Sequence, residues 1–529
     1  MRGNARGVVA LVVLVLVGAC TQQNTTPSPT PAASPSAIKP ARGGTLTFVA
    51  NEQPATYDAH QLTSPAALDL LAPEYSVLYK IDPLDPAHLV PDIAVDQPQL
   101  SSDKLTVTVK LRTDAKFADG AQLTSADVVA TYQKILAGTP RASWYAMVDS
   151  VSAPDASTVA FKLKTVDSGF LQLLASPWNL IYSAAKLKQD AHFYDTNVDG
   201  TGPFTFVSNN KGVDWTAKRN DAYFGKDAAG TQLPYLDGFT ALIRGDAAAQ
   251  LDAIKTKKAT IDFQGFTVAQ RNDLAKAIGS DLALQEITES CVDTLIPNTS
   301  KKPFDQVAVR QAITLAIDRR GNNATLSTKM NLKDVGGLMR PHSAWVISDA
   351  DLQNVKGFGT DTSAAHDAAK KALSDAGVSN LSFNLVTPEG DEYTPETDLL
   401  IDQWKQAGIT ATRVALPPDA KIPEGVGDIV LQTRCYALDE PDRVFASLRG
   451  VYSDTNLDGQ IDAQSKETDL NKRILDVIAL QKYVMDEKAY VFPVLWRFRS
   501  VPYLKSLRGW QQGPGVPSPT DLSTVWIAS

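Results

Sequence analysis

Two hydrophobic periods alternate along the chain. Gly44 to Ala50 is predicted to be a buried strand, and Leu105 to Leu111 alternates apolar residues with Thr and Lys, as in a half-buried strand. Apolar residues at helical spacing follow Thr124, a suitable N-cap, and a second such stripe follows Pro303, where Asp305 can cap the helix. The pattern predicts interleaved strands and helices.

The later part of the chain has the pattern of a βαβ unit. Leu381 to Val386 and Ile409 to Leu416 are predicted strands, and the helix between them runs from Glu396 to Ala407. Such units are right-handed and make their strands parallel, so the sequence predicts an α/β fold. Asp428 to Gln432 is a further short buried strand, and binding groups in open α/β sheets lie just beyond strand ends.

The N-terminal segment has the pattern of an export signal. Arg2 and Arg6 precede the apolar run Val8 to Gly18, and Cys20 follows after small residues. Cys20 resembles the lipobox cysteine of bacterial lipoproteins, whose thiol receives a diacylglyceryl group. We therefore expect residues 1–19 to be a signal peptide and the exported protein to be lipid-anchored at the outer face of the cytoplasmic membrane. The alternatives are an incidental cysteine after a plain signal peptide, or a short transmembrane helix, for which the run falls short of about 20 residues.

The next segment predicts a spacer. Residues 20–42 are rich in Thr, Pro, Ser, Ala and Gln without apolar periodicity, so they cannot bury enough surface to offset the entropy of ordering. We expect a lipidated flexible tether. The remainder, from about Gly43 to Ser529, is too long for one ordinary core, which predicts two lobes or more.

Composition and motifs narrow the function. The formal net charge is −8, whereas a nucleic-acid binder needs a basic surface. The five histidines form no H-E-x-x-H pattern, and neither G-x-S-x-G nor a phosphate-binding glycine loop occurs. We therefore expect a protein that binds no nucleic acid, is not an enzyme and requires no cofactor.

Cysteine is used sparingly. Besides Cys20, the chain contains only Cys291 and Cys435, and neither has metal-binding spacing. In an exported protein two such thiols usually pair, so a disulfide is favoured. Two separately buried thiols are the alternative.

One stretch resembles the signature of family 5 extracellular solute-binding proteins, the receptors of oligopeptide and dipeptide ABC importers. It is LTVTVKLRTDAKFADGAQLTSADVV, Leu105 to Val129. Further matching stretches, in the same order as in the family, are TGPFTF from Thr201, RNDAYFG from Arg219, NTSKKPFDQVAVRQAITLAIDR from Asn298 and GDIVLQTRC from Gly427. The resemblance covers nearly all of Gly43 to Trp510.

The resemblance implies a two-lobed periplasmic-binding-protein-like fold, type II and cluster C-like, with an extra subdomain in the first lobe. The implied first lobe consists of residues 43–65, 195–289 and 494–529, and the extra subdomain of residues 66–194. The second lobe is residues 290–493. The chain crosses twice between the lobes, and the two crossings would form the hinge.

The function that this family implies is solute capture. We expect a monomeric substrate-binding lipoprotein that encloses a peptide or peptide-like solute between closing lobes and delivers it to the permease subunits of an ABC importer. Its only contact with the membrane would be the lipid anchor. The alternative is a surface solute sensor or adhesive lipoprotein of the same fold that is not coupled to import.

The resemblance also suggests where the solute binds. Oligopeptide receptors of the family carry a cysteine pair where Cys291 and Cys435 stand, which implies a disulfide and a ligand site near Cys435. The family pattern there is Trp-Cys-x-Asp, whose Asp pairs with the α-ammonium group of the peptide. This chain has Arg434 in place of the Trp and Ala437 in place of the Asp.

The two replacements leave the ammonium group without its partner. A carboxylate from Asp439 or Glu440 can substitute if the loop is shifted, whereas the cationic Arg434 suggests a solute with a carboxylate or another anion. The alternative is that Arg434 only pairs with Asp439 or Glu440 at the lobe surface. The residues do not decide between these interpretations.

Other candidate ligand-binding residues are aromatic, amide or basic side chains near predicted strand ends, where aromatic rings would stack on a solute. They are Asn51, Tyr57, Trp144, Trp178, Gln264, Trp496 and Arg497. Ordinary core packing is the alternative for each of them. Trp404 lies on a helix face and is expected in the core.

One motif stands outside the family pattern. Asp454, Asn456, Asp458 and Asp462 have the spacing of oxygen ligands in an EF-hand-like calcium loop, with Gly459 at its sharp turn. The usual Glu at the twelfth position is absent. The motif predicts a structural calcium site, with a plain Asn-Asp-Gly turn as the alternative.

Overall fold

The structure is a computed structural model that describes residues 39–82, 88–390, 392–417, 427–436, 438–513 and 521–528. Pro40–Ser529 forms one compact unit. The expected signal peptide, Cys20, the tether up to residue 38 and Ala437 lie outside the described residues. Within the described ranges, none of the helices combines the length and apolar character of a membrane span.

Hydrophobic side chains gather in separate cores, which define the parts named below. The first lobe surrounds a core that contains Trp215, and the subdomain surrounds a core that contains Phe161. The second lobe has two cores, one around Trp404 and one around Phe445. Leu438, from the second lobe's sequence, lies in the core of the subdomain, so the two parts share buried surface.

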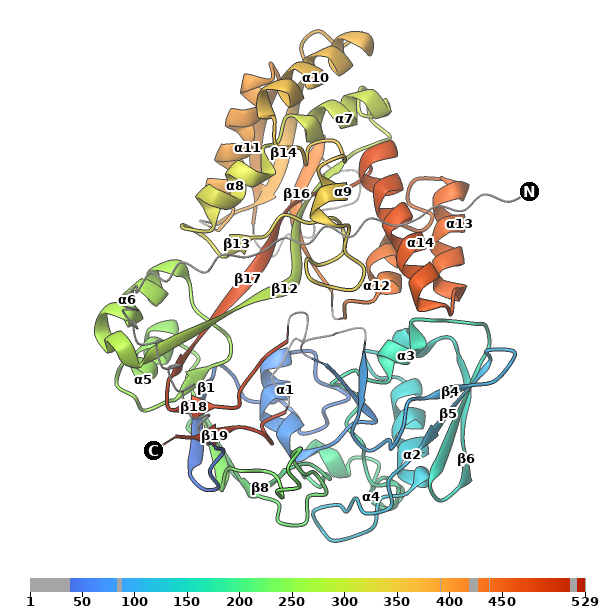
Figure 1. Cartoon of the computed structure of the whole chain (residues 1–529), viewed down its shortest axis with the longest axis vertical. Helices are drawn as coiled ribbons and strands as arrows, with labels where there is room; N and C mark the ends of the chain where they lie inside the picture. The colour runs from blue at the N-terminus through green and yellow to red at the C-terminus, as the bar shows by residue number, and fades with distance from the viewer. Residues whose placement is uncertain are drawn as a thin grey trace, which may run out of the picture. The chain divides into compact units, whose positions relative to one another are not determined.

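One mixed sheet extends through both lobes. Its strands are β1 (Thr45–Ala50), β8 (Phe204–Asn210), β9 (Asp214–Arg219), β10 (Gly238–Ile243), β11 (Ile261–Asp262), β12 (Leu282–Pro297), β13 (Leu332–Lys333), β14 (Ser382–Pro388), β15 (Thr410–Leu416), β16 (Ile429–Cys435) and β17 (Phe492–Leu504). Their order is β15-β14-β16-β12-β17-β11-β1-β10-β9-β8, and β13 pairs with β17. The long strands β12 and β17 pair antiparallel and connect the lobes (Figure 1).

The second lobe contains the predicted βαβ unit. Its sheet shares a core with helices α7 (Val307–Leu315), α8 (Arg319–Leu326), α10 (Thr362–Asp375) and α11 (Thr394–Gln406). Because β14 and β15 are parallel and α11 connects them, the prediction is confirmed, and Trp404 is fully buried as expected. The predicted cap at Asp305 is wrong: the chain makes another turn first, and α7 begins after Gln306.

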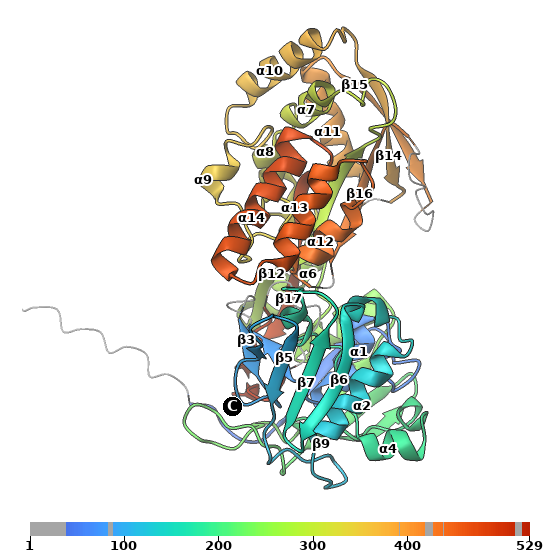
Figure 2. The ribbon, with the colours of Figure 1, turned by 90° about the vertical axis from the view of Figure 1, so that its right-hand side faces the viewer.

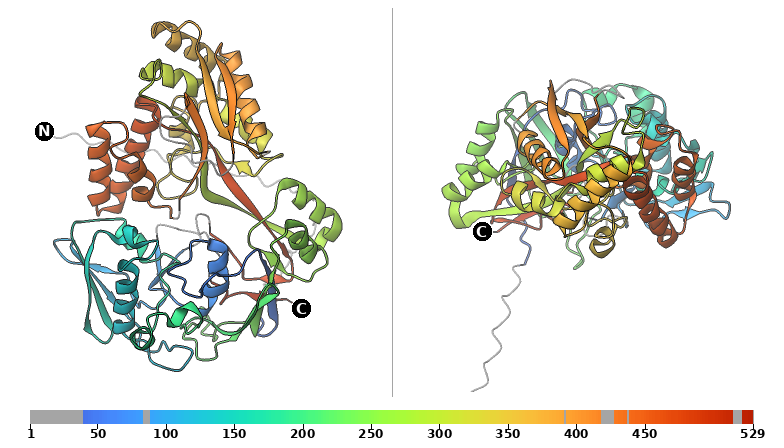
Figure 3. Two further views of the ribbon diagram at one scale, coloured as in Figure 1. Left: turned by 180° about the vertical axis from the view of Figure 1, so that it is seen from behind. Right: turned by 90° about the horizontal axis from the view of Figure 1, so that it is seen from above.

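The second core of this lobe is helical. Its helices are α9 (Asp349–Leu352), α12 (Pro441–Phe445), α13 (Thr455–Lys466) and α14 (Leu470–Lys482), and a π-helical turn, Tyr483–Glu487, follows α14. Of these helices, α12, α13 and α14 lie next to the subdomain in Figures 1 and 3. The amide of Ser168 donates to the carbonyl of Ser465 over 2.8 Å, which joins the two parts directly.

The subdomain is a small sheet with one main helix, and its sheet faces the viewer in Figure 2. Its elements are β4 (Gln99–Leu100), β5 (Thr106–Lys110), α2 (Ser125–Leu136), β6 (Val148–Asp155), β7 (Thr158–Leu163) and α3 (Phe170–Leu173), with strand order β4-β5-β7-β6. Thr124 and Asp127 form a capping box at the start of α2. The strand and helix predicted here are confirmed.

The rest of the first lobe covers its part of the main sheet. It contains α1 (Pro65–Leu71), α4 (Ala184–Gln189), α5 (Ala247–Lys255), α6 (Val268–Ile278) and the short strand pair β18 (Leu507–Arg508) with β19 (Trp526–Ile527). The strand pair β2 (Tyr79–Ile81) with β3 (Leu89–Pro91) packs instead against the core of the subdomain. The predicted strand at Gly44 to Ala50 is confirmed as β1, which lies between β11 and β10 in the sheet interior.

Candidate solute site at the hinge

A cavity of about 660 Å3 lies beside the two connecting strands. The first lobe contributes the segment after β1, the start of α1, Trp178 and Gln264 after β11, and the subdomain contributes Pro140, Arg141 and Trp144. The end of β16 contributes Cys435 and Tyr436. The cavity is therefore shared by all three parts of the molecule.

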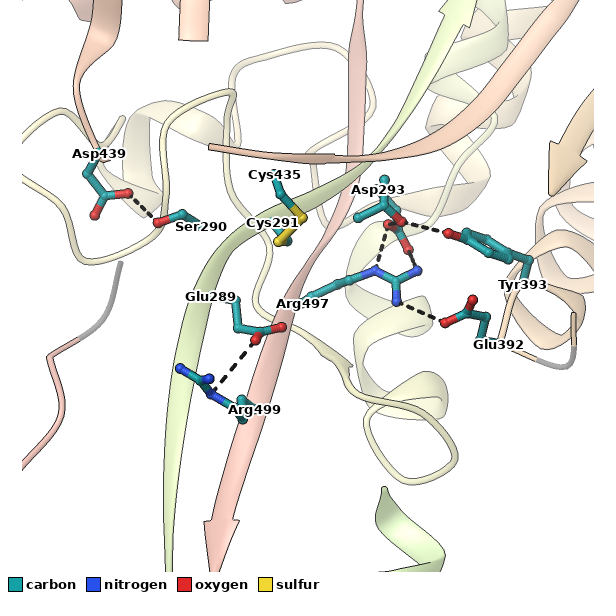
Figure 4. Close-up of a disulfide and its surroundings, with 11 residues drawn as sticks. Glu289, Ser290, Cys291, Asp293, Glu392, Tyr393, Cys435, Asp439, Arg497 and Arg499 are labelled. Atoms are coloured by element: carbon teal, nitrogen blue, oxygen red, sulfur yellow. Dashed lines mark hydrogen bonds and ion pairs between the residues drawn. A yellow bond between two sulfur atoms is a disulfide. The ribbon is translucent and has the colours of Figure 1, made fainter. Parts of the chain in front are cut away.

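An irregularity in β12 shapes the cavity wall. Between the register pairs Thr288–Phe498 and Val292–Trp496, three residues of β12 face one residue of β17. A β-bulge of this kind bends a strand and redirects its side chains. These three residues of β12, 289–291, all line the cavity. Figure 4 shows them where β12 and β17 cross.

Cys291 and Cys435 form a disulfide, as expected. They are opposite each other in the antiparallel register of β12 and β16, and 144 residues separate them in sequence. Both line the cavity. The disulfide therefore attaches the bulge to the second-lobe sheet at the edge of the site (Figure 4).

Charged groups surround Arg499, a cavity residue of β17. Its Nε lies 3.8 Å from Oε1 of Glu289, too far for a good hydrogen bond. Behind the cavity wall, Gln264 donates its side-chain amide to Asp69 over 3.2 Å and its backbone amide to Asp262 over 2.9 Å. Burial raises the pKa of Asp262 to about 7 and that of Asp69 well above its usual range, while Arg499 opposes both shifts.

The cavity contains four of the candidate residues from the sequence: Asn51, Trp144, Trp178 and Gln264. Tyr57 lies instead against the Trp215 ring and accepts a hydrogen bond from Asn209. These contacts place Tyr57 against the first-lobe core, and it is not among the described residues that line the cavity.

Two further candidates on β17 form contacts within the second lobe and do not line the cavity. The Trp496 indole is buried and donates to the carbonyl of Gly337 over 3.1 Å. The Arg497 guanidinium donates to both carboxylate oxygens of Asp293, over 2.9 and 3.0 Å (Figure 4). The sequence pointed to Arg497 and not to Arg499, although Arg499 lines the cavity. Alternation along a strand shows which residues share a face, but it does not show which of them lie next to the cavity.

Asp439 and Glu440 have partners other than Arg434. Asp439 accepts a hydrogen bond from Ser290 over 2.9 Å and pairs with Arg340 over 2.5 Å. Glu440 pairs with Arg473. The structure therefore does not support the alternative in which Arg434 pairs with one of these acids. Arg434 is also not among the cavity-lining side chains that the structure describes, so its role in anion binding stays a prediction.

The calcium motif forms a helix, which corrects both interpretations of it. Residues 455–466 are α13, and Asp454 is its N-cap, accepting from the amides of Asn456 and Leu457 over 3.0 and 3.1 Å. Asp458 accepts a hydrogen bond from the Gly450 amide, and Asp462 pairs with Arg449. The expected calcium ligands therefore have different protein partners and do not point at one common site. In the described part of the chain, no group of three or more His, Cys, Asp or Glu side chains is arranged around a metal site.

Comparison with known sequences identifies relatives of the chain. The family described as bacterial extracellular solute-binding proteins, family 5 middle, matches residues 88–456. The glutathione-binding protein GsiB of Pectobacterium atrosepticum is 31% identical over 237 residues, 43% of each chain. The oligopeptide-binding protein AppA of Bacillus subtilis is 29% identical over 329 residues, 59% of this chain and 56% of that protein. The chain thus spans about half the length of these relatives.

Solved structures show the same fold. The ABC transporter substrate-binding protein CtaP from Listeria monocytogenes superposes with a TM-score of 0.78 at 21% identity, over 92% of this chain and 100% of that chain. The expected two-lobed α/β fold is confirmed. Since the family match also covers most of the sequence, the chain belongs to family 5 of the bacterial extracellular solute-binding proteins.

Proposed function

We propose that the protein is the substrate-binding component of an ABC importer, which captures a peptide or peptide-like solute in the hinge cavity and delivers it to a membrane permease. One observation carries the proposal: the cavity is lined by both lobes and lies on the two strands that connect them. Its volume of about 660 Å3 is within the range of about 300–1,000 Å3 typical of small-molecule sites. Rotation of the lobes about these strands would enclose a solute.

The chemistry of the wall suits an amide-rich solute. Trp144, Trp178 and Tyr436 offer aromatic faces for apolar side chains. The side-chain oxygen of Asn51 is buried and has no hydrogen-bond partner among the described residues, so an N–H of a bound solute would satisfy it. Two relatives are named for glutathione and for oligopeptides, which supports the same class.

The proposal includes the location of the protein and its lack of catalysis. The sequence pattern around Cys20 supports attachment through a lipid to the outer face of the cytoplasmic membrane. The proposal takes the protein to be a monomer. The family consists of solute-binding proteins, which supports delivery of the solute without chemical change.

The experiment is direct identification of the solute. Full-length protein would be purified from its own host, and native mass spectrometry would identify any co-purified molecule. Calorimetry would then measure binding of glutathione and a panel of di-, tri- and longer peptides. A solute at 100 times its Kd should stabilise the protein by about 2.7 kcal/mol. The proposal fails if no peptide binds, or if a bound peptide is converted to product.

A further inference from the structure

Arg141 is the cavity cation whose charge has no acidic partner. Among the described residues, the acidic and basic side chains that line the cavity are Glu52, Arg141, Glu289 and Arg499. Arg499 lies near Glu289 and near the two buried carboxyls behind the wall. Arg141, by contrast, makes no ion pair with any carboxylate in the described part of the chain.

The surroundings of Arg141 hold its side chain in one position. Its residue is only 7% exposed. Its guanidinium donates to the main-chain carbonyls of His60 and Leu62. It lies 3.5 Å from the centre of the Trp178 ring and 5.8 Å from that of Trp144. Carbonyl dipoles and aromatic faces orient a cation but do not neutralise it.

The titratable groups around Arg141 do not neutralise its positive charge. Burial lowers the pKa of Arg141 to about 10, so the group is still a cation at neutral pH. Burial lowers the pKa of His60 to about 4, which makes that ring neutral. Asp58, which lies beside His60, forms its own ion pair with Lys134 over 2.8 Å. Arg443 approaches Trp144 from the second lobe, but Asp167 and Asp442 lie near Arg443 and offset its charge.

A buried charge in a protein is normally paired, and an unpaired one is costly. The side of Arg141 that remains open is the one that lines the cavity, so the missing anion would have to come from the solute. A carboxylate is the anion that a guanidinium fork matches, because two parallel hydrogen bonds can form. The indole faces of Trp144 and Trp178 would exclude water from this pair.

We propose that Arg141 binds a carboxylate of the solute beside Trp178, and that the cavity therefore selects solutes with a free carboxylate over their neutral amides. The inference rests on the proposed function and specifies the solute class: a short peptide or amino-acid-derived molecule with an unblocked acid group. The inference places the anion-binding residue in the subdomain, at Arg141, whereas the sequence had suggested Arg434 in the second lobe. Arg141 is then a specificity-determining residue.

The test compares acid and amide forms of the same peptides. Calorimetry on the full-length protein would measure each peptide of the panel with a free C-terminal carboxylate and with a C-terminal amide, for wild type and for Arg141→Gln. Wild type should bind the acid at least about 30-fold more tightly than the amide. In Arg141→Gln this preference should disappear. Arg320→Gln, which removes a half-buried arginine paired with Asp349 outside the cavity, should retain the preference.

The outcomes separate this inference from the function on which it rests. If peptides bind but the acid-to-amide ratio is the same in wild type and Arg141→Gln, the role of Arg141 is overturned and the receptor function stands. If no peptide binds to wild type, both fail. If Arg141→Gln does not fold, Arg141→Lys and the wild-type protein are compared instead. Lysine keeps the positive charge but cannot form two parallel hydrogen bonds, so the acid-to-amide affinity ratio should fall. A wild-type acid-to-amide ratio near one overturns the inference.

Discussion

The charged cluster between the subdomain and the second lobe offers a quantitative test of the structure. Arg473, on α14, has a 4% exposed side chain and pairs with Glu440, whose side chain is 1% exposed. It also lies 3.5 Å from Asp442. Asp167 of the subdomain approaches the same group, so that Arg473 holds acidic residues of both parts together. The perturbation is Arg473→Met, which keeps volume but removes the charge.

The magnitude follows from burial. Removing one partner of a buried ion pair leaves an uncompensated charge and typically costs about 3–5 kcal/mol. The entropy of unfolding is about 2.1 cal/mol/K per residue, so unfolding of the compact unit Pro40–Ser529 should increase the entropy by roughly 1 kcal/mol/K. The melting temperature should therefore fall by about 3–5 °C at neutral pH.

The effect should depend on pH with a defined sign. Burial, reinforced by neighbouring carboxylates, raises the pKa of Asp167 and of Asp442 to about 6. A carboxyl whose folded pKa exceeds its unfolded pKa stabilises the fold when protonated, and this contribution is lost as the pH rises through about 6. Without Arg473 the acids repel more strongly when ionised. The deficit of the variant should be largest at pH 8 and smaller at pH 5.

Differential scanning calorimetry at pH 5, 6.5 and 8 measures both effects. Arg320→Met is the matched control: the Arg320–Asp349 side chains are 32% and 66% exposed, and such a surface pair contributes at most about 1 kcal/mol. A deficit for Arg473→Met no larger than that of the control would refute the reasoning. A deficit that is the same at all three pH values would refute the assignment to ionised carboxylates.

Two further changes test the disulfide and a close backbone contact. Replacing Cys291 and Cys435 with Ser removes a cross-link between residues 144 positions apart, which should lower the free energy of unfolding by up to about 5 kcal/mol. A reductant should lower the melting temperature of the wild-type protein to that of the variant. Unequal melting temperatures would contradict this prediction. In Gly202→Ala the new Cβ would lie 2.5 Å from the backbone nitrogen of Tyr75, so urea unfolding should show a loss of about 1–3 kcal/mol or more. Gly459→Ala in α13 meets nothing within 4 Å and should stabilise by up to about 1 kcal/mol; a similar loss in both variants would contradict the close contact.

Local patterns predicted the elements of the fold well. The strand at Leu105 to Leu111 and the capped helix after Thr124 depend on residue spacing within a few positions, which the sequence contains directly. The βαβ unit around Glu396 to Ala407 follows from the same periodicity and from the handedness of crossovers.

The calcium motif shows where local patterns mislead. The spacing of Asp454, Asn456 and Asp458 suits a loop, but Leu457 and Ile461 are buried in the second core, and the hydroxyl of Tyr490 donates to Asp454 over 3.0 Å. These contacts come from residues distant in sequence, and they favour a helix. Tertiary packing therefore overrides the preference of the segment.

The site itself depended on contacts that no local pattern contains. Asn51 and Trp178 were identified because aromatic and amide groups near strand ends are common in binding sites. Arg141 was missed although it stands three residues before Trp144, because only the fold shows that its charge lacks an acid. The bulge that turns Glu289 into the cavity has no sequence signature, since it arises from a mismatch in the pairing of two distant strands.

The covalent link between β12 and β16 has a mechanical consequence. Before Thr288, β12 is supported by the hydrogen-bonded ladder with β17, and from Cys291 onward it is secured to its other neighbour. Glu289 and Ser290, which lie between these two stretches, have no partner in either ladder, although Ser290 is held by the Tyr436 amide and by Asp439. Bending of β12 should therefore occur mainly at Glu289. Because both residues line the cavity, a molecule that enters it would touch β12 where its two neighbouring strands support it least, and a small rotation there would be carried along the strand into the second lobe.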